Sequence, residues 1–221
     1  MVGTKNAQGP VVVDSELGPR ALRKAQRPQE ILHAAFEEFV DRGYTATRIE
    51  DVATRAGVTK GTIYLYFQNK EELFQDVVRK LSQPIFDENQ FLEQNEQRSC
   101  DELVRLFLDA LYEHMTVNPY SREILRFLIA DGRSFPTLVS THFDQFVKPL
   151  LTIFDRILQK GVREGVFEIW AEDHISQVLI SPALNYAIDM LLSADTKLPE
   201  LKIYKNTHYE MVMRTIRKAS V

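Results

Sequence analysis

The chain has 221 residues, of which 44% are hydrophobic and 26% are charged, and its formal net charge is −4. This is ordinary globular composition, sufficient for one large domain or two small ones with a substantial core. We find neither a signal-peptide pattern nor a run of about 18 apolar residues, so we expect no secretion, no membrane insertion and a cytoplasmic location. The single cysteine, Cys100, cannot form an internal disulfide or anchor a metal cluster.

The charge is unevenly distributed along the chain. Residues 20–70 hold nine Lys and Arg against six Asp and Glu, whereas residues 71–221 hold 17 against 23. Binding to DNA phosphates needs a local basic surface rather than a basic protein, and an acidic remainder limits indiscriminate binding to nucleic acid. The negative net charge therefore does not exclude DNA binding by the N-terminal part.

The N-terminal residues 1–19 combine glycine and proline without a helical period, and we expect a disordered tail there. A basic run of Arg20, Arg23, Lys24 and Arg27 follows. Such a run is often only a solvated helix face. Its place directly ahead of the helices in the basic part of the chain favours contact with phosphate or with the minor groove.

A first helix is predicted from Pro28, which suits the first helical position, to a stop at Gly43. A second helix is predicted to begin at Thr47, because Thr47 and Glu50 have the spacing of a capping box. The first helix has an apolar stripe that should form the core of a small domain. The stripe consists of Leu32, Ala35, Phe36, Phe39 and Val40.

A very short turn follows the second helix. Gly57 stands where a left-handed residue most easily ends a helix, and Thr59 can cap a third helix over about residues 60–67. Two helices joined by such a glycine-containing turn cross steeply, in the helix-turn-helix geometry. Ile63 and Phe67 are four residues apart and should face inward, which leaves the opposite face of the third helix outside.

The outward face of the third helix has residue types that suit duplex DNA. Lys60 lies in the first turn, where the positive end of the helix dipole also attracts phosphate. Gly61 lets backbone approach backbone, and Tyr64 offers a ring for a thymine methyl group or a hydroxyl for a phosphate. A further capping box, Asn69 to Glu72, opens a fourth helix with Lys70 in its first turn as a phosphate contact. The residues predicted to contact DNA are Thr47, Arg48, Thr59, Lys60, Gly61, Thr62, Tyr64, Tyr66 and Lys70.

These residues also carry a family resemblance. The segment from about residue 28 to residue 74 resembles the DNA-binding domain of the TetR family of one-component repressors, through AAFEEFVDRGYTATRIEDVATRAGV, KGTIYLYF at 60–67 and NKEELF at 69–74. It covers about a fifth of the chain. The resemblance implies an all-α fold, with an N-terminal three-helix helix-turn-helix domain and a larger helical domain that binds an effector and dimerises.

We divide the chain into a tail at 1–19, a helix-turn-helix DNA-binding domain at 20–70 and a helical effector-binding and dimerisation domain at 71–221. The fourth helix should end before Pro84 and link the two domains.

The larger domain shows only helical signals. A capping box, Ser99 to Glu102, opens one helix, and Asn118-Pro119 starts another that Gly132 ends. A long helix follows from about residue 134, and Pro149 should kink it. No alternating run bounded by hairpin turns appears, so no sheet is expected.

The last two helices, near 173–192 and 201–218, are rich in apolar residues. The resemblance implies that they pair with their copies in a second subunit as a four-helix bundle. The alternative is that they only close the core of their own subunit.

Aromatic and polar residues in the larger domain could line an effector pocket, or could equally be ordinary core. The candidates are Phe107, Tyr112, His114, Arg126, Phe127, Phe143, Phe146 and Phe154, with His142 and Trp170 considered beside them.

The favoured function is a DNA-binding transcriptional regulator, as a repressor that binds a palindromic operator as a dimer and is released by a small-molecule effector. No metal site, cofactor or catalytic grouping is recognisable in the sequence, so we do not expect an enzyme. A helical scaffold protein and an all-helical enzyme with an unrecognised site are the alternatives. Binding to duplex DNA that falls steeply with salt separates the regulator from both.

Overall fold

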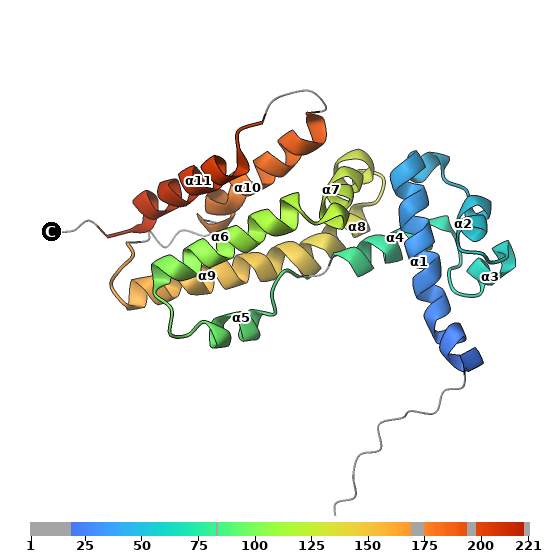
Figure 1. Ribbon diagram of the computed structural model, residues 1–221, viewed down its shortest axis with the longest axis horizontal. Helices are drawn as coiled ribbons and strands as arrows, with labels where there is room; N and C mark the ends of the chain where they lie inside the picture. The colour runs from blue at the N-terminus through green and yellow to red at the C-terminus, as the bar shows by residue number, and fades with distance from the viewer. Residues whose placement is uncertain (1–18, 83, 169–174, 194–197, 219–221) are drawn as a thin grey trace, which may run out of the picture.

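The computed structural model describes residues 19–82, 84–168, 175–193 and 198–218 of an elongated helical molecule (Figure 1). The predicted tail at 1–18 and the pocket candidate Trp170 lie outside the described residues. Pro19, assigned to the tail, is instead the first residue of a helix.

The N-terminal part is built from four helices: α1 (Pro19–Ala46), α2 (Ile49–Arg55), α3 (Lys60–Tyr64) and α4 (Lys70–Leu81). The predicted start of the first helix at Pro28 is wrong, because α1 begins nine residues earlier and continues through this proline at the loss of one backbone hydrogen bond. Gly43 has a φ of 75° and breaks the helical path near the end of α1, as expected of a glycine stop. The third helix is shorter than predicted, because turns replace it after Tyr64.

In the residues that the structure describes, the C-terminal part continues with seven α-helices and one π-helical turn. They are α5 (Glu88–Gln94), α6 (Cys100–Thr116), α7 (Pro119–Asp131), α8 (Pro136–His142), η1 (Phe143–Val147), α9 (Lys148–Arg163), α10 (Ile175–Leu192) and α11 (Leu201–Ile216). The predicted capping box at Ser99 and Glu102 is present at the start of α6. Within the described ranges, the extended backbone pairs only in an isolated bridge between Phe167 and Arg217, so the all-α prediction is confirmed. The sequence did not predict α5.

A π-helical turn takes the place of the predicted proline kink. Helices α8 and α9 form one continuous rod through η1, where the backbone N–H of Lys148 donates to the carbonyl of Phe143, five residues back. This wide turn comes directly before Pro149, which has no N–H to continue the α-helical ladder.

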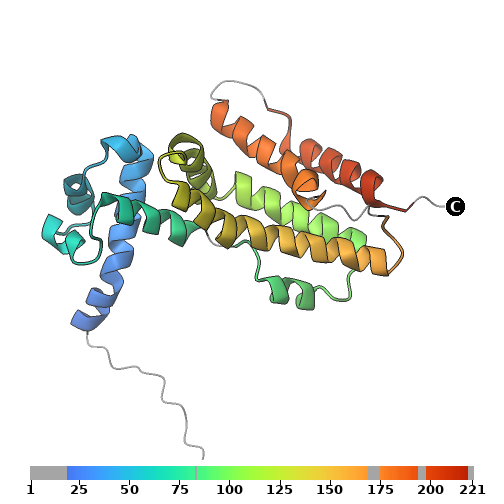
Figure 2. The same ribbon diagram turned by 180° about the vertical axis from the view of Figure 1, so that it is seen from behind.

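The buried residues form two cores, and the predicted domain boundary at residue 70 does not separate them. The N-terminal core contains residues of α1 to α4, and also Ile124 and Phe127 of α7, Phe135, and Leu138 of α8. The C-terminal core lies between α6, α9, α10 and α11. Seen from behind, α4 crosses from the N-terminal helices to the rest of the molecule (Figure 2). Helix α4 therefore belongs to the DNA-binding domain by its packing.

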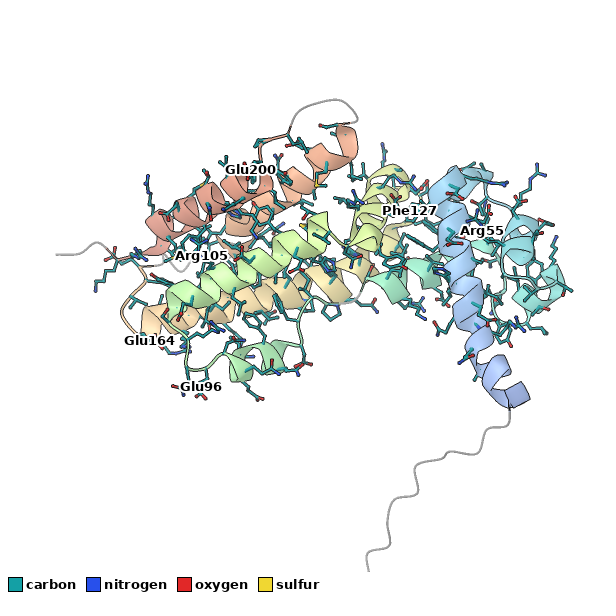
Figure 3. All side chains as sticks on the ribbon, viewed as in Figure 1. Arg55, Glu96, Arg105, Phe127, Glu164 and Glu200 are labelled. Atoms are coloured by element: carbon teal, nitrogen blue, oxygen red, sulfur yellow. The ribbon has the colours of Figure 1, made fainter. Side chains whose placement is uncertain are left out.

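Phe74 of α4 is at the centre of an aromatic cluster that joins the two parts. Its ring centroid lies 4.9 Å from those of Phe39 and Tyr44, 5.3 Å from that of Phe127 and 5.4 Å from that of Phe135. Figure 3 shows Phe127 where α7 meets the N-terminal helices. The cluster fixes α4 to α1 on one side and to α7 on the other.

Helix α10 departs from the expectation that no segment is long and apolar enough to cross a membrane. Among the described residues it is the one helix that meets this test by length and composition. Its inner face packs in the C-terminal core through Leu179, Ala183 and Tyr186. Its outer face leaves Val178 67% exposed and Leu192 78% exposed. Helix α10 is therefore packed on one side and leaves apolar side chains exposed on the other.

Replacing Phe74 by alanine is expected to lower the free energy of unfolding by about 3–5 kcal/mol, because the side chain is fully buried and leaves a cavity in the N-terminal core. Phe143, which is 44% exposed, is the matched control, and Phe143→Ala should cost less than about 1 kcal/mol. Urea unfolding measures both values, and equal losses would contradict the role assigned to the cluster.

Candidate nucleic-acid interface and effector cavity

Helices α2 and α3 form the predicted helix-turn-helix. Gly57 has a φ of 65° in the turn, and the side chain of Thr59 accepts a hydrogen bond from the backbone N–H of Thr62 at the start of α3. Ile63 and Phe67 are buried, as their spacing predicted. The opposite side of α3 faces away from the protein, at the end of the molecule remote from α10 and α11 (Figure 1).

Arg55 holds α2 against α1. Its Nε lies 2.7 Å from Oε1 of Glu38, and its Nη2 lies 2.6 Å from Oδ2 of Asp41 (Figure 3). These bonds, that of Asp41 first, raise the pKa of Arg55 above its usual value. A second bridge joins Arg42 of α1 to Asp51 of α2 at 2.9 Å. A network of this kind fixes the orientation of α2, and therefore the direction in which α3 points.

The exposed face of α3 presents the predicted groups. Lys60 is exposed and its Nζ lies 2.6 Å from Oε1 of Glu50, a pairing that raises the lysine pKa. Gly61 is exposed, and Tyr64 is 46% exposed. A DNA phosphate would have to compete with Glu50 for Lys60.

The hydroxyls on this face are partly engaged. The Oγ1 atoms of Thr59 and Thr62 lie 2.9 Å apart and share a hydrogen bond, and Tyr66 is half-buried against the N-terminal core. Leu65, which the sequence analysis did not assign, is 81% exposed directly after α3. Leu65 lies two residues from Ile63 and from Phe67, which both face inward. Because residues two apart lie on opposite sides of a helix, this spacing could have indicated that Leu65 points outward.

Thr47 does not have the role predicted for it. It is only 2% exposed, and its hydroxyl donates to the backbone carbonyls of Glu38 and Gly43 at 3.0 and 2.8 Å. The predicted capping box is therefore absent, and Arg48 is the residue that precedes α2, without a side-chain cap. The Thr47 hydroxyl is withdrawn from the surface, whereas Arg48 is exposed beside it.

Lys70 is also differently engaged. Its Nζ donates to the carbonyls of Tyr44, Thr45 and Thr47 at 2.7, 3.2 and 2.9 Å, and lies 4.4 Å from the centroid of the Tyr44 ring. Burial lowers its pKa. An ammonium group has three protons, and three carbonyls at the end of α1 accept them. In this conformation Lys70 ties α4 to the α1–α2 connection and offers no free N–H to a phosphate.

A cavity of about 310 Å³ lies where α4 ends against the C-terminal helices. Its walls come from α4, α6, α7, the α8–η1–α9 rod and α10. The lining residues are Leu81, Ser82, Leu111, His114, Met115, Ser121, Ile124, Leu125, Leu128, His142, Phe146, Val147, Leu150, Leu151, Gln177, Ile180, Ser181, Leu184 and Ala187.

Two of the predicted pocket residues, His114 and Phe146, line this cavity, and so does His142. Four others are fully buried elsewhere, because their rings pack against other aromatic residues. They are Phe107, Tyr112, Phe127 and Phe154. For these four the ordinary-core alternative holds.

The last two predicted pocket residues also lie outside the cavity lining. Arg126 binds Glu123 at 2.6 Å and donates to the carbonyl of Val40 in α1 at 3.2 Å, so it joins the two parts of the molecule. Phe143 is 44% exposed and does not line the cavity. The polar lining residues Ser82, Ser121, Gln177 and Ser181 were missed, because small polar residues on separate helices give no sequence pattern.

Three rings form a stack in the cavity wall. The ring of Phe146 lies between the imidazoles of His142 and His114, with centroids 5.1 and 5.0 Å away and interplanar angles of 19° and 26°. Ser82 Oγ lies 2.9 Å from Nδ1 of His142, and Ser121 Oγ lies 2.7 Å from Nε2 of His114. Burial lowers the pKa of both histidines, that of His142 to about 4. Burial therefore favours the neutral form of both rings.

Comparisons with known proteins agree with this geometry. The family described as "Bacterial regulatory proteins, tetR family" matches residues 31–77. The chain is 30% identical over 154 residues to the uncharacterized HTH-type transcriptional regulator YfiR of Bacillus subtilis (strain 168), covering 66% of this chain and 70% of that protein. The chain belongs to the TetR family. It is a DNA-binding transcriptional regulator.

Two further comparisons extend beyond the N-terminal helices. The HTH-type transcriptional repressor KstR2 of Mycolicibacterium smegmatis is 29% identical over 147 residues, covering 65% of this chain and 68% of that protein. The crystal structure of the transcriptional regulator FadR from Bacillus subtilis in complex with stearoyl-CoA matches with a TM-score of 0.65 at 21% identity, over 83% of this chain and 96% of that one. The second likeness shows that the fold extends into the C-terminal helices.

Replacing Gly61 by alanine should weaken DNA binding without harming the fold. A Cβ at this position would meet only Oγ1 of Thr59, at 3.7 Å, and alanine favours the helix by about 0.5–1 kcal/mol. On DNA the same methyl group would hold α3 away from the duplex. Anisotropy with a duplex selected from random sequences should show at least about a tenfold loss. Gln68→Ala, at an exposed position past α3, is the control and should bind normally.

Lys70→Ala should lower the free energy of unfolding by about 1–2 kcal/mol, because three carbonyls lose a partly solvated cationic donor. Lys60→Ala should leave the free energy of unfolding nearly unchanged. It should reduce the slope of log DNA affinity against log salt concentration by about one. Urea unfolding and salt-dependent anisotropy of both variants separate the roles. If Lys70→Ala instead has the same free energy of unfolding as the parent, and its DNA affinity depends less steeply on salt by about one unit of slope, the phosphate contact predicted from the sequence is right.

Proposed function

We propose that this regulator binds a palindromic operator as a homodimer in the cytoplasm and represses transcription until a small molecule enters the cavity at the end of α4. The position of that cavity is the observation that carries the proposal. One end of α4 holds the connection between α1 and α2 through Lys70, and the other end supplies Leu81 and Ser82 to the cavity wall. A ligand in the cavity therefore touches the helix that orients α3.

The lining suits an apolar ligand, because leucine, isoleucine, valine, methionine and phenylalanine supply most of it. Its size lies at the lower end of the range of small-molecule sites. The FadR structure is a complex with stearoyl-CoA, which supports regulation by a small molecule, and the likeness to KstR2 supports repression. A ligand that prefers one position of α4 shifts DNA affinity by the coupling free energy, typically about 1–3 kcal/mol, and DNA shifts ligand affinity by the same factor.

The dimer is supported by the uncovered side of α10 and α11, which lie next to each other on one side of the molecule (Figures 1 and 2). Five large apolar side chains on these helices are exposed by 40% or more. They are Val178, Leu184, Leu192, Ile203 and Met211. Pairing two copies through this strip would bury it and present two recognition helices. Their separation should be about 34–36 Å, or somewhat wider, to meet successive major grooves.

Val178→Lys should convert the dimer into a monomer and abolish specific DNA binding, because a lysine would be buried in the interface without a partner. Val117→Lys is the matched control: both valines are 67% exposed, but Val117 lies just after α6 and away from the strip. Sedimentation at micromolar concentration and anisotropy with the selected duplex test the pair. A monomeric parent protein, or an unaffected Val178→Lys dimer, would overturn the proposed interface.

A further inference from the structure

The cavity is uncharged as well as apolar. Among its described lining residues there is no Asp, Glu, Lys or Arg, and burial lowers the pKa of its two histidines, His114 and His142, which favours their neutral forms. Burying an ion without a partner of opposite charge costs far more than burying a neutral group of the same shape. An acyl-CoA, whose phosphates are anionic, would find no cation in this wall.

Two imidazoles in the ring stack, those of His142 and His114, supply hydrogen-bonding groups to one side of the cavity, and Gln177 and Ser181 of α10 line it as well. Each imidazole is tied at one nitrogen to a serine, His142 to Ser82 and His114 to Ser121. The two serines differ in position. Ser121 is in α7, whereas Ser82 caps the C-terminal end of α4.

Ser82 makes a specific connection between α4 and α8. It is only 2% exposed, and its hydroxyl lies 2.9 Å from Nδ1 of His142. A serine hydroxyl in the last turn of a helix can also bond the carbonyl four residues back. The Ser82–His142 hydrogen bond can therefore be exchanged without leaving the serine unpaired, provided that another group satisfies the imidazole.

We infer that the effector is an uncharged, largely apolar molecule with one hydroxyl or carbonyl group, and that this group bonds His142 in place of Ser82 and so frees the end of α4. The inference rests on the proposed effector role of the cavity and specifies both the class of ligand and its point of action. A neutral hydrogen-bonding group satisfies the imidazole that Ser82 leaves, while the apolar body fills the space between α7 and α10.

Three probes with the same apolar chain and different head groups test the ligand class: 1-octanol, octanoate and octyltrimethylammonium. Calorimetry of the full chain at pH 7.5 should show octanol binding about tenfold or more tightly than either ion. Octanoate is measured in two buffers of different ionisation enthalpy. If it binds as tightly as octanol and takes up a proton, the histidines form an anion site and the inference is wrong; it also fails if octanol does not bind at millimolar concentration.

Two variants with opposite expected effects test the point of action. Ser82→Ala removes the competitor for His142 and should tighten octanol binding about three- to tenfold, whereas His142→Phe keeps a ring on Phe146 and should weaken it about tenfold. Ser140→Ala, at an exposed serine of α8, is the control and should bind as the parent does. Circular dichroism melts confirm folding. Unchanged octanol affinity in both variants would overturn the exchange at His142.

A separate readout distinguishes this inference from the proposed function. Octanol that binds with the expected preference should also release the selected duplex. If it binds in this way but leaves DNA affinity unchanged, the inferred ligand class stands and the link from cavity to DNA fails. If DNA is released equally by all three probes, the link stands and the inferred neutral ligand class fails.

Discussion

The packing of Phe74 against rings from α1, α7 and the segment before α8 is the constraint on which the arrangement of this regulator depends. It makes α4 a shared element, because the helix packs in one core against both α1 and α7 and cannot move against one of them without disturbing the other. Close-packed aromatic interiors tolerate discrete rearrangements better than continuous deformation. A connection through such a cluster transmits a displacement, where a flexible linker would absorb it.

Much of the fold and of the DNA-binding face could be predicted from the sequence, because the signals are local. The turn at Gly57, the cap at Thr59, the inward pair Ile63 and Phe67 and the capping box at Ser99 each depend on residues within about one helical turn. The resemblance to TetR proteins rested on the same local run. Helix periodicity likewise predicted most C-terminal helices, although not the short α5.

Two predicted contact residues are engaged in ways that the sequence did not indicate, because each has a long-range partner. Lys70 binds carbonyls more than 20 residues away, and the Thr47 hydroxyl is taken by Glu38 across the turn. Neither contact leaves a pattern in the sequence. For the pocket, large aromatic residues were favoured as lining. In the structure most of them pack against each other, and smaller residues are left around the space.

The π-helical turn at Phe143–Val147 determines how the side chains of α9 are rotated about the helix axis relative to those of α8. In an α-helix, positions four apart drift by about 40° at each step, so Leu138, His142, Phe146 and Leu150 would soon leave a common face. A wider turn reduces that drift. It lets Leu138 reach the N-terminal core while Phe146 and Leu150 reach the C-terminal one. Losing one residue from this turn would rotate α9 by about 100° relative to α8, so the rod could no longer serve both cores.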